Sequence, residues 1–119
     1  MINILSLSLQ GSWDTIVVGK NIIRILDNPK FISLRISNDY RSIAVVPCES
    51  KDVMSFRVPE KLFESKNCSC KIHSKGFIFD VLTKNNLDPL STYAIHGTYV
   101  ESQKAVVFNL KDAKIANAK

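Results

Sequence analysis

Four side chains in this sequence are of the types that bind zinc. Cys48, Cys68, Cys70 and His73 supply thiolate and imidazole ligands, but only Cys68 and Cys70 form a close pair. Structural zinc sites usually combine two close pairs of ligands. If residues 68–73 form a strand, Cys68 and Cys70 share one face and His73 lies on the other. We therefore predict small buried thiols, no metal site and no cofactor, with zinc binding by the cysteines as the alternative.

A catalytic site would have to use the two histidines, His73 and His96, which lie in or beside apolar, strand-like stretches. Cys68 or Cys70 with His96 is the one pairing that could activate a thiolate, and no surrounding pattern supports it. The carboxylates form no recognisable pair for acid–base chemistry, and the four glycines do not cluster into a phosphate-binding loop. The sequence therefore predicts a protein that is not an enzyme, with no catalytic residue and no small-molecule substrate.

Basic side chains are the remaining candidates for function. Lysine and arginine number 16 against 11 aspartates and glutamates, which gives a formal net charge of +5. The charge is spread along the chain without a block of like residues, so it is compatible with nucleic acid without being diagnostic. Contacts with duplex DNA are predicted for four cations on or near the two expected helices: Lys20, Arg24, Lys71 and Lys75. Further positive field is expected from the hairpin residues Arg35, Arg41 and Lys104.

The elements that must position these residues follow from hydrophobic periodicity. Strands are expected at 2–9, 14–18, 31–36, 42–46, 56–58, 68–72, 92–99 and 104–110. Helices are expected at 19–27 and 75–86, and each is followed by a proline that cannot continue it. The tail after residue 110 is expected to be weakly helical or frayed. We predict one α+β domain over residues 1–119, strand-rich, and barrel-like or two-layered.

The order strand, helix, strand, strand occurs twice in this prediction. The two copies span about residues 14–48 and 69–110. An offset of 55 places Lys20 on Lys75, and offsets of 59 and 63 align the hairpins, with Leu34 on Tyr93. Both extra steps of four residues are expected in loops, where insertions are tolerated. The apolar pattern repeats more than the residues do, so either an internal duplication or common α+β patterning accounts for it.

The repeated unit resembles the swapped-hairpin domain of AbrB/MazE/MraZ-type transcription regulators and antitoxins. The resemblance is carried by Val17-Val18-Gly19-Lys20-Asn21-Ile22 with Leu26, and by Ile72-His73-Ser74-Lys75-Gly76-Phe77 with Val81. Such domains complete one barrel from two copies, which implies that this chain closes a barrel within itself and binds DNA. Gly19 and Ser74 stand where the family has proline, and the DNA-facing glycine-arginine turn of the family is absent from both copies.

The alternative to a DNA-binding regulator or accessory factor is a protein-interaction module that binds no nucleic acid. Residues 2–9 alternate leucine with serine and carry no lysine, so they are expected to form a sheet edge that pairs with a second copy in a homodimer. Trp13 is expected to cover the core rather than to anchor an interface. Four phenylalanines are also expected in the core, which leaves no aromatic surface for stacking bases: Phe31, Phe77, Phe79 and Phe108.

The first residues have neither the basic leading region nor the cleavage site of a secretory signal. No uncharged apolar run reaches the ~18 residues that a membrane span requires. We therefore expect a soluble, cytoplasmic protein with no membrane partner.

Overall fold

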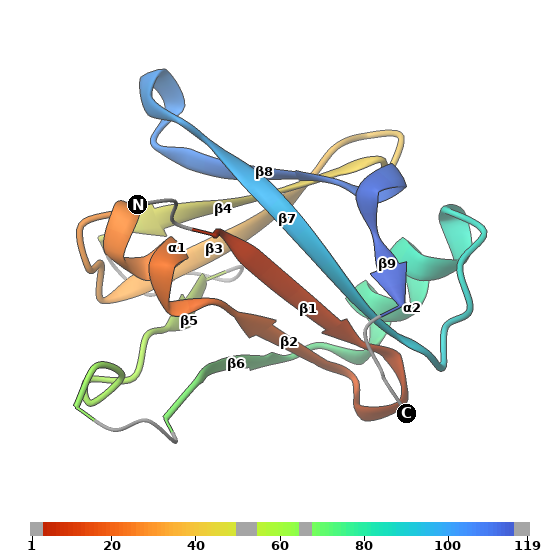
Figure 1. Ribbon diagram of the computed structural model, residues 1–119, viewed down its shortest axis with the longest axis horizontal. Coiled ribbons are helices and arrows are strands. Elements are labelled where there is room, and N and C mark those ends of the chain that lie inside the picture. The colour runs from red at the N-terminus through yellow and green to blue at the C-terminus, as the bar shows by residue number, and fades with distance from the viewer. Residues whose placement is uncertain (1–3, 50–54, 65–67, 116–119) are drawn as a thin grey trace.

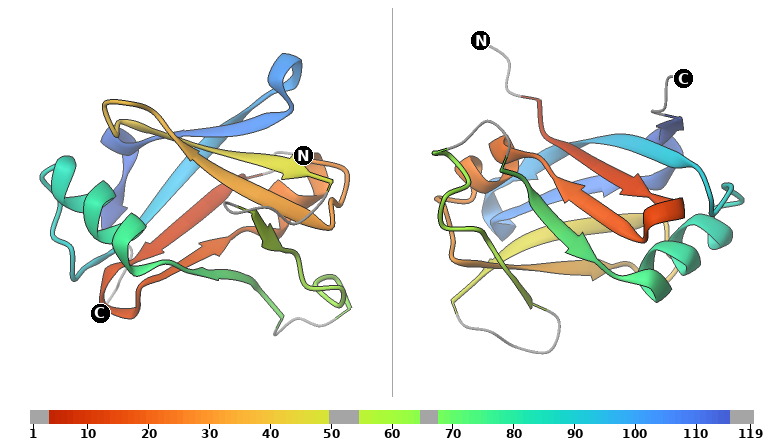
Figure 2. Two further views of the ribbon diagram at one scale, coloured as in Figure 1. Left: turned by 180° about the vertical axis from the view of Figure 1, so that it is seen from behind. Right: turned by 90° about the horizontal axis from the view of Figure 1, so that it is seen from below.

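A computed structural model describes residues 4–49, 55–64 and 68–115, and this part of the chain forms one nine-stranded antiparallel sheet (Figure 1). The strands are β1 (Ser6–Gln10), β2 (Thr15–Val18), β3 (Phe31–Ile36), β4 (Ser42–Cys48), β5 (Ser55–Arg57), β6 (Cys70–His73), β7 (Thr92–Val100), β8 (Ala105–Asn109) and β9 (Lys114–Ile115). Their order is β5-β3-β4-β8-β7-β1-β2-β6, and β9 pairs with β7 beside this path. The sheet curls into a nearly closed barrel (Figure 2), so the predicted strand-rich, barrel-like α+β class is confirmed.

Two α-helices occur in the described residues, α1 (Lys20–Ile25) and α2 (Lys75–Lys84), and they lie at opposite ends of the molecule (Figures 1 and 2). Three short 3-10 turns join strands: η1 (Gly11–Trp13), η2 (Glu101–Gln103) and η3 (Leu110–Asp112). The core is filled by alternate strand residues, such as Leu7 and Leu9 on β1, which are almost completely buried. Each helix adds one apolar stripe to this core, with Ile78, Val81 and Leu82 on α2.

The two halves of the described chain use the same order of elements. β1-β2-α1-β3-β4 is followed by β5-β6-α2-β7-β8. The two halves also make equivalent strand pairings. β2 pairs with its counterpart β6, and β4 pairs with its counterpart β8. The pairing of β1 with β7 corresponds to the pairing of β5 with β3. The exception is β1·β2, whose counterpart β5·β6 is unpaired. The barrel is therefore open at one seam, between β5 and β6.

The hairpin of each half contacts the helix of the other half. At the β3–β4 turn, the Tyr40 carbonyl accepts a hydrogen bond of 2.7 Å from Asn85 Nδ2 at the end of α2. On the other side, Tyr99 and Lys104 of the β7–β8 hairpin share a pocket with Leu26 at the end of α1. The two halves are thus in contact at the end of α2 and share a pocket at the end of α1.

The expectation that residues 2–9 form a sheet edge is wrong for the described part of that segment. β1 pairs with β2 on one side and with β7 on the other, so its backbone is not available to a second copy. Ser6 and Ser8 lie half-buried on the face opposite Leu7 and Leu9. Small serines are compatible with this central position, whereas nothing in the pattern of residues 4–10 indicates which strands lie beside β1. The tail also differs from expectation, because residues 114 and 115 form β9.

The alignment of the halves needs two corrections. The offset between the halves first increases by four residues, from 55 to 59, within the helix and not in a loop. The reason is that α2 has 10 residues and α1 has 6. The second correction concerns the two hairpins. Leu34 pairs with Val45, and Gly97 pairs with Phe108. In these registers Gly97, and not Tyr93, is the residue equivalent to Leu34. One added helical turn, not a longer loop, accounts for the first step.

Candidate functional site

The four cations predicted to bind DNA do not form one cluster. Lys20 is the first residue of α1 and is half-buried, and Lys71 is exposed on β6 opposite Val17. Lys75 begins α2, and its side chain lies outside the described residues. Val18 lies opposite Cys70, so α1 begins beyond one end of the β2·β6 ladder and α2 beyond the other. At about 3.3 Å per strand residue, the two helix starts are about 20 Å apart.

Arg24, the fourth of these cations, is held in place by contacts with neighbouring residues of the protein. Its Nη1 donates a 3.2 Å hydrogen bond to Asn21 Oδ1, and its guanidinium lies 4.6 Å from the centre of the Phe63 ring. A guanidinium over an aromatic face gains about 0.5–1 kcal/mol at an exposed site. This contact gives Arg24 a structural role between α1 and the segment that follows β5. The hairpin cations Arg35, Arg41 and Lys104 are all exposed.

The strand pattern is confirmed for Cys70 and His73, whereas Cys68 lies before the first residue of β6. Cys70 is buried on β6 with Ile72, whereas His73 is exposed on the opposite face and its Nδ1 lies 3.1 Å from Thr15 Oγ1. Cys48 and Cys68 are only half-buried, so the expectation of buried thiols is confirmed for Cys70 and wrong for the other two. Among residues 4–49, 55–64 and 68–115, no three metal-ligating side chains come together.

His96 is also far from the thiols with which it could pair. It lies exposed on β7, and both β1 and β2 separate β7 from the strand that carries Cys70. Three strand spacings of about 4.8 Å amount to about 14 Å, which is too far for a nucleophile–base pair.

Cys70 should be the slowest of the three thiols to react with iodoacetamide. Burial, and secondly the neighbouring Cys68, raise the pKa of its thiol from 9.0 to about 11, so little thiolate exists near pH 8. Mass spectrometry of the native protein should find Cys48 and Cys68 alkylated first, whereas all three should react alike in denaturant. Above pH 9 the unfolded chain loses this proton before the folded chain does, so stability should fall between about pH 9 and 11. Equal native rates would contradict the burial.

An apolar surface that the sequence analysis did not predict lies where η1, α2 and the segment before β7 meet. Trp13, Phe79 and Leu90 are 74%, 54% and 71% exposed, so the expectation that Trp13 and Phe79 belong to the core is wrong. Phe79 and Leu90 line a hollow of about 520 Å³ together with Gly11, Ser12, Asp14, Gly76 and Pro89. Trp13 does not line it, but lies in sequence between the lining residues Ser12 and Asp14. We call Trp13, Phe79, Leu90 and this hollow the apolar surface.

The helical pattern indicated the exposure of Phe79, one of the three side chains of the apolar surface. Ile78, Val81 and Leu82 share one face of α2, and Phe79 lies about 100° around the helix from Ile78, away from that face. Trp13 gave no such signal, because its exposure depends on how η1 packs at the end of the β1–β2 hairpin. The Phe31 and Phe77 side chains are half-buried, and Phe108 is completely buried.

Backbone hydrogen bonds fix the three segments that carry the apolar surface. Gly11 N donates to Ser91 O at 3.0 Å, and Ser74 N donates to Asp14 O at 3.0 Å. The Asp88 carboxylate accepts from Leu90 N and from Ser91 Oγ, both at 3.0 Å, and so holds the turn before β7. A side chain at position 11 would collide with the backbone of the 89–91 segment, which explains the glycine there. The surface is therefore held in one geometry by the backbone beneath it.

Three carboxylates belong to residues that line the hollow or adjoin its lining residues in sequence. Asp14 lines the hollow, Asp80 follows Phe79 on α2, and Asp88 precedes Pro89 and Leu90. No lysine or arginine is among the described residues that line the hollow. In a chain of net charge +5 this end thus combines exposed apolar side chains with carboxylates.

No family model matches this chain, and neither a curated protein nor a solved structure matches it. In the described residues, none of the helices has the length and apolar character needed to cross a membrane. The geometry of the surface is therefore the basis for assigning a function.

Proposed function

We propose that this protein is a non-enzymatic protein-interaction module that uses the apolar surface for docking. The observation that carries the proposal is the high exposure of Trp13, Phe79 and Leu90, of which Phe79 and Leu90 line one hollow. Contiguous exposed apolar side chains are typical of interaction sites in soluble domains, and tryptophan is the residue type most enriched among those that dominate binding energy.

The fixed backbone beneath the apolar surface supports this proposal. The hydrogen bonds from Gly11 to Ser91 and from Ser74 to Asp14 join the three segments before any partner arrives. A partner then does not have to order these segments on binding. Because this entropy cost is absent, more of the contact energy contributes to affinity. Burial of Trp13 in a partner pocket is expected to contribute at least about 2 kcal/mol.

The chemistry of the partner follows from the carboxylates at this end of the molecule. Asp14, Asp80 and Asp88 would repel an acidic segment and attract lysine or arginine. We therefore propose a partner segment that combines large apolar side chains with flanking basic residues.

Selection of random peptides on the immobilised protein should enrich this kind of sequence. Trp13 is the single tryptophan of the chain, so peptide binding should shift its fluorescence to shorter wavelength as water leaves the ring. Exchange of Leu90 for alanine should weaken binding roughly tenfold or more, in line with the loss of one central apolar contact.

The matched control is Ile115→Ala, which removes another exposed apolar side chain, 65% exposed on β9. This variant should bind the selected peptides as the unmodified protein does. Peptides that bind equally well after Leu90→Ala, or that carry acidic flanks, would contradict the proposal.

A DNA-binding regulator of AbrB/MazE/MraZ type, formed by internal duplication, is the second candidate. The observation that favours it is the exchange of hairpins, in which Asn85 on α2 bonds to Tyr40 of the other half. Lys20 and Lys71 would then meet phosphates from the β2·β6 side of the barrel. Retention on duplex DNA at low salt that is lost after Lys20→Glu with Lys75→Glu, without any peptide selected on the apolar surface, would replace the first candidate with this one.

A further inference from the structure

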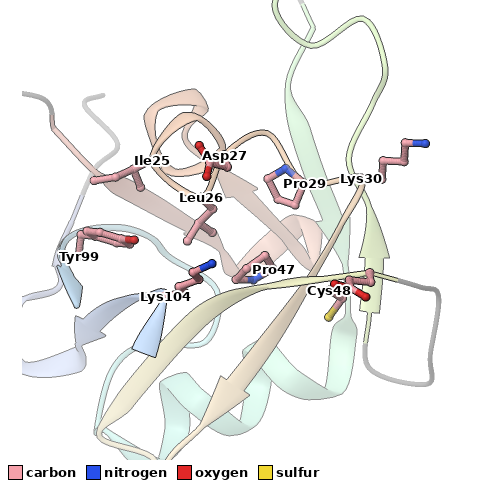
Figure 3. A pocket seen from close by; sticks show the side chains of 10 residues that line it. Ile25, Leu26, Asp27, Pro29, Lys30, Pro47, Cys48, Tyr99 and Lys104 are labelled. Carbon is pink, nitrogen blue, oxygen red and sulfur yellow. The ribbon is translucent and has the colours of Figure 1, made fainter. Parts of the chain in front are cut away.

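A pocket lies at each of the two junctions where the helix of one half ends against the hairpin of the other. The first has a volume of about 460 Å³ and is formed by the ends of α1 and β4 and by the β7–β8 hairpin (Figure 3). The second, of about 270 Å³, is formed by the end of α2, the residues after β8 and the β3–β4 turn. We call the second one the cation pocket.

The two pockets occupy equivalent places in the two halves. Asp27 follows the cap of α1 with φ 66°, and Asn86 follows the cap of α2 with φ 59°, so both helices end in a left-handed residue. Lys104 lies at the end of the β7–β8 turn and lines the first pocket, and Arg41 lies at the end of the β3–β4 turn and lines the second. The pockets can therefore be compared position by position.

The first pocket is balanced in charge. Lys30 and Lys104 line it together with Asp27 and Glu49. Figure 3 shows Lys104 near Leu26 across the pocket, whereas the side chain of Lys30 extends away from it. Two carboxylates thus accompany the cations at this junction, and the pocket has no excess of positive charge.

The cation pocket differs in charge from its counterpart. Arg41, Lys84 and Lys111 line it, and no carboxylate is among its lining residues. Asn86 stands where the first pocket has Asp27, so a neutral amide replaces a negative charge. Three cationic side chains, from three different segments, therefore line one small pocket.

The negative groups near the cation pocket are too few or already engaged. Asp39 accepts hydrogen bonds from Ser37 Oγ at 2.7 Å and from Arg41 N at 3.0 Å, and its carboxylate also attracts the charge of Arg41, so it offsets part of the positive charge there. Asp112 follows Lys111 in η3 without lining the pocket. The carbonyl end of α2 contributes only about half a negative charge. The three positive charges of Arg41, Lys84 and Lys111 are larger than this half negative charge.

Contacts across the junction hold two walls of the cation pocket together. Asn85 Nδ2 donates to Tyr40 O at 2.7 Å and to Val81 O at 2.8 Å, which joins the β3–β4 turn to α2. The Lys84 ammonium lies 4.6 Å from the centre of the Tyr40 ring. Lys84 and Arg41 are thus presented on a joined framework rather than on separate loops.

We propose that the cation pocket binds the phosphate group of a small phosphorylated ligand. Its charge matches a dianion, and the planar fork of Arg41 suits two phosphate oxygens. A volume of about 270 Å³ lies below the range of about 300–1,000 Å³ usual for drug-sized ligands, so a phosphate with a short substituent fits better than a whole nucleotide. This proposal is independent of the apolar surface.

The test is a titration of the full chain with inorganic phosphate, and in parallel with phosphoserine, at constant ionic strength. Nuclear magnetic resonance should show saturable shifts of the Asn86 side-chain amide and of the backbone amides of residues 110–113. The variant Arg41→Gln with Lys111→Gln should weaken phosphate binding roughly tenfold or more, because each removed contact is a charge-assisted hydrogen bond. Both side chains are exposed, so the fold should persist.

The matched control is Lys30→Gln with Lys104→Gln, which removes the same charge from the first pocket. It should leave phosphate affinity unchanged. Failure of the shifts to saturate, or equal weakening in the two double variants, would overturn the proposal. Stronger shifts of the same amides by duplex DNA, without saturation by phosphoserine, would also overturn it, because the site would then be a contact for a nucleic-acid backbone.

Discussion

Replacement of Gly97 by alanine should lower the free energy of unfolding by about 1–3 kcal/mol, as overpacking of a filled core does. Gly97 lies on β7 directly opposite Phe108, and a Cβ there would be 2.6 Å from Cε2 and 2.7 Å from Cδ2 of the ring. Phe108 is completely buried within the core, so the ring has little room to retreat. The cost comes from this contact and not from backbone geometry, because none of the described glycines has a positive φ.

Urea denaturation followed by circular dichroism measures this loss. Gly76→Ala is the matched control, since a Cβ at that helical position would meet no heavy atom within 4 Å beyond its chain neighbours and its own helix backbone. That variant should be unchanged or more stable by up to about 1 kcal/mol. Gly97→Ala combined with Phe108→Leu should be less destabilised than the sum of the single changes. Strict additivity, or a Gly97→Ala variant of full stability, would contradict the steric argument.

The second large effect is expected at Leu62, where alanine should cost about 2–5 kcal/mol. Leu62 is 1% exposed and belongs to the core, although it lies in the connection between β5 and β6. These are the two strands that leave the barrel unclosed. Its buried side chain joins the connection between these two strands to the core.

Hydrogen exchange and denaturant unfolding together test the role of Leu62. The adjacent Phe63→Ala is the matched control, because Phe63 is 41% exposed and its loss removes the Arg24 contact, worth about 0.5–1 kcal/mol. In Leu62→Ala, faster exchange should appear first in β5 and β6, next to the seam. Equal destabilisation by the two variants would show that Leu62 does not hold this connection.

Local pattern predicted the individual strands and the inner face of most of them. In β2 and β6 the alternation correctly places Ile16 and Ile72 inside, and Lys71 outside. Pattern could not predict which strands are neighbours. Leu7 pairs with Ile95, and no feature of residues 5–9 specifies that distant partner. The alternating pattern of these residues therefore predicts an edge strand, which the pairing with both β2 and β7 contradicts.

The candidate sites were harder to predict for the same reason. Residue type identified Lys20 and Lys71 as cations, but their separation depends on the register of β2 with β6. Trp13 was assigned to the core because large apolar side chains usually are buried, and its 74% exposure follows from how η1 packs. Arg41, Lys84 and Lys111 lie far apart in sequence and meet only because a hairpin of one half contacts the helix of the other.

The central position of β1 determines when the chain can fold. β1 pairs with β7, and β4 pairs with β8, so strands made early in synthesis wait for partners made late. Closing such long loops is slow, because their entropy is lost before the distant contacts form. A nascent chain that ends before β7 exposes the apolar faces of β1 through β6 with no means of closing the barrel. Folding should therefore begin only after the β3–β4 and β7–β8 hairpins have both left the ribosome. We expect this domain to fold slowly for its size.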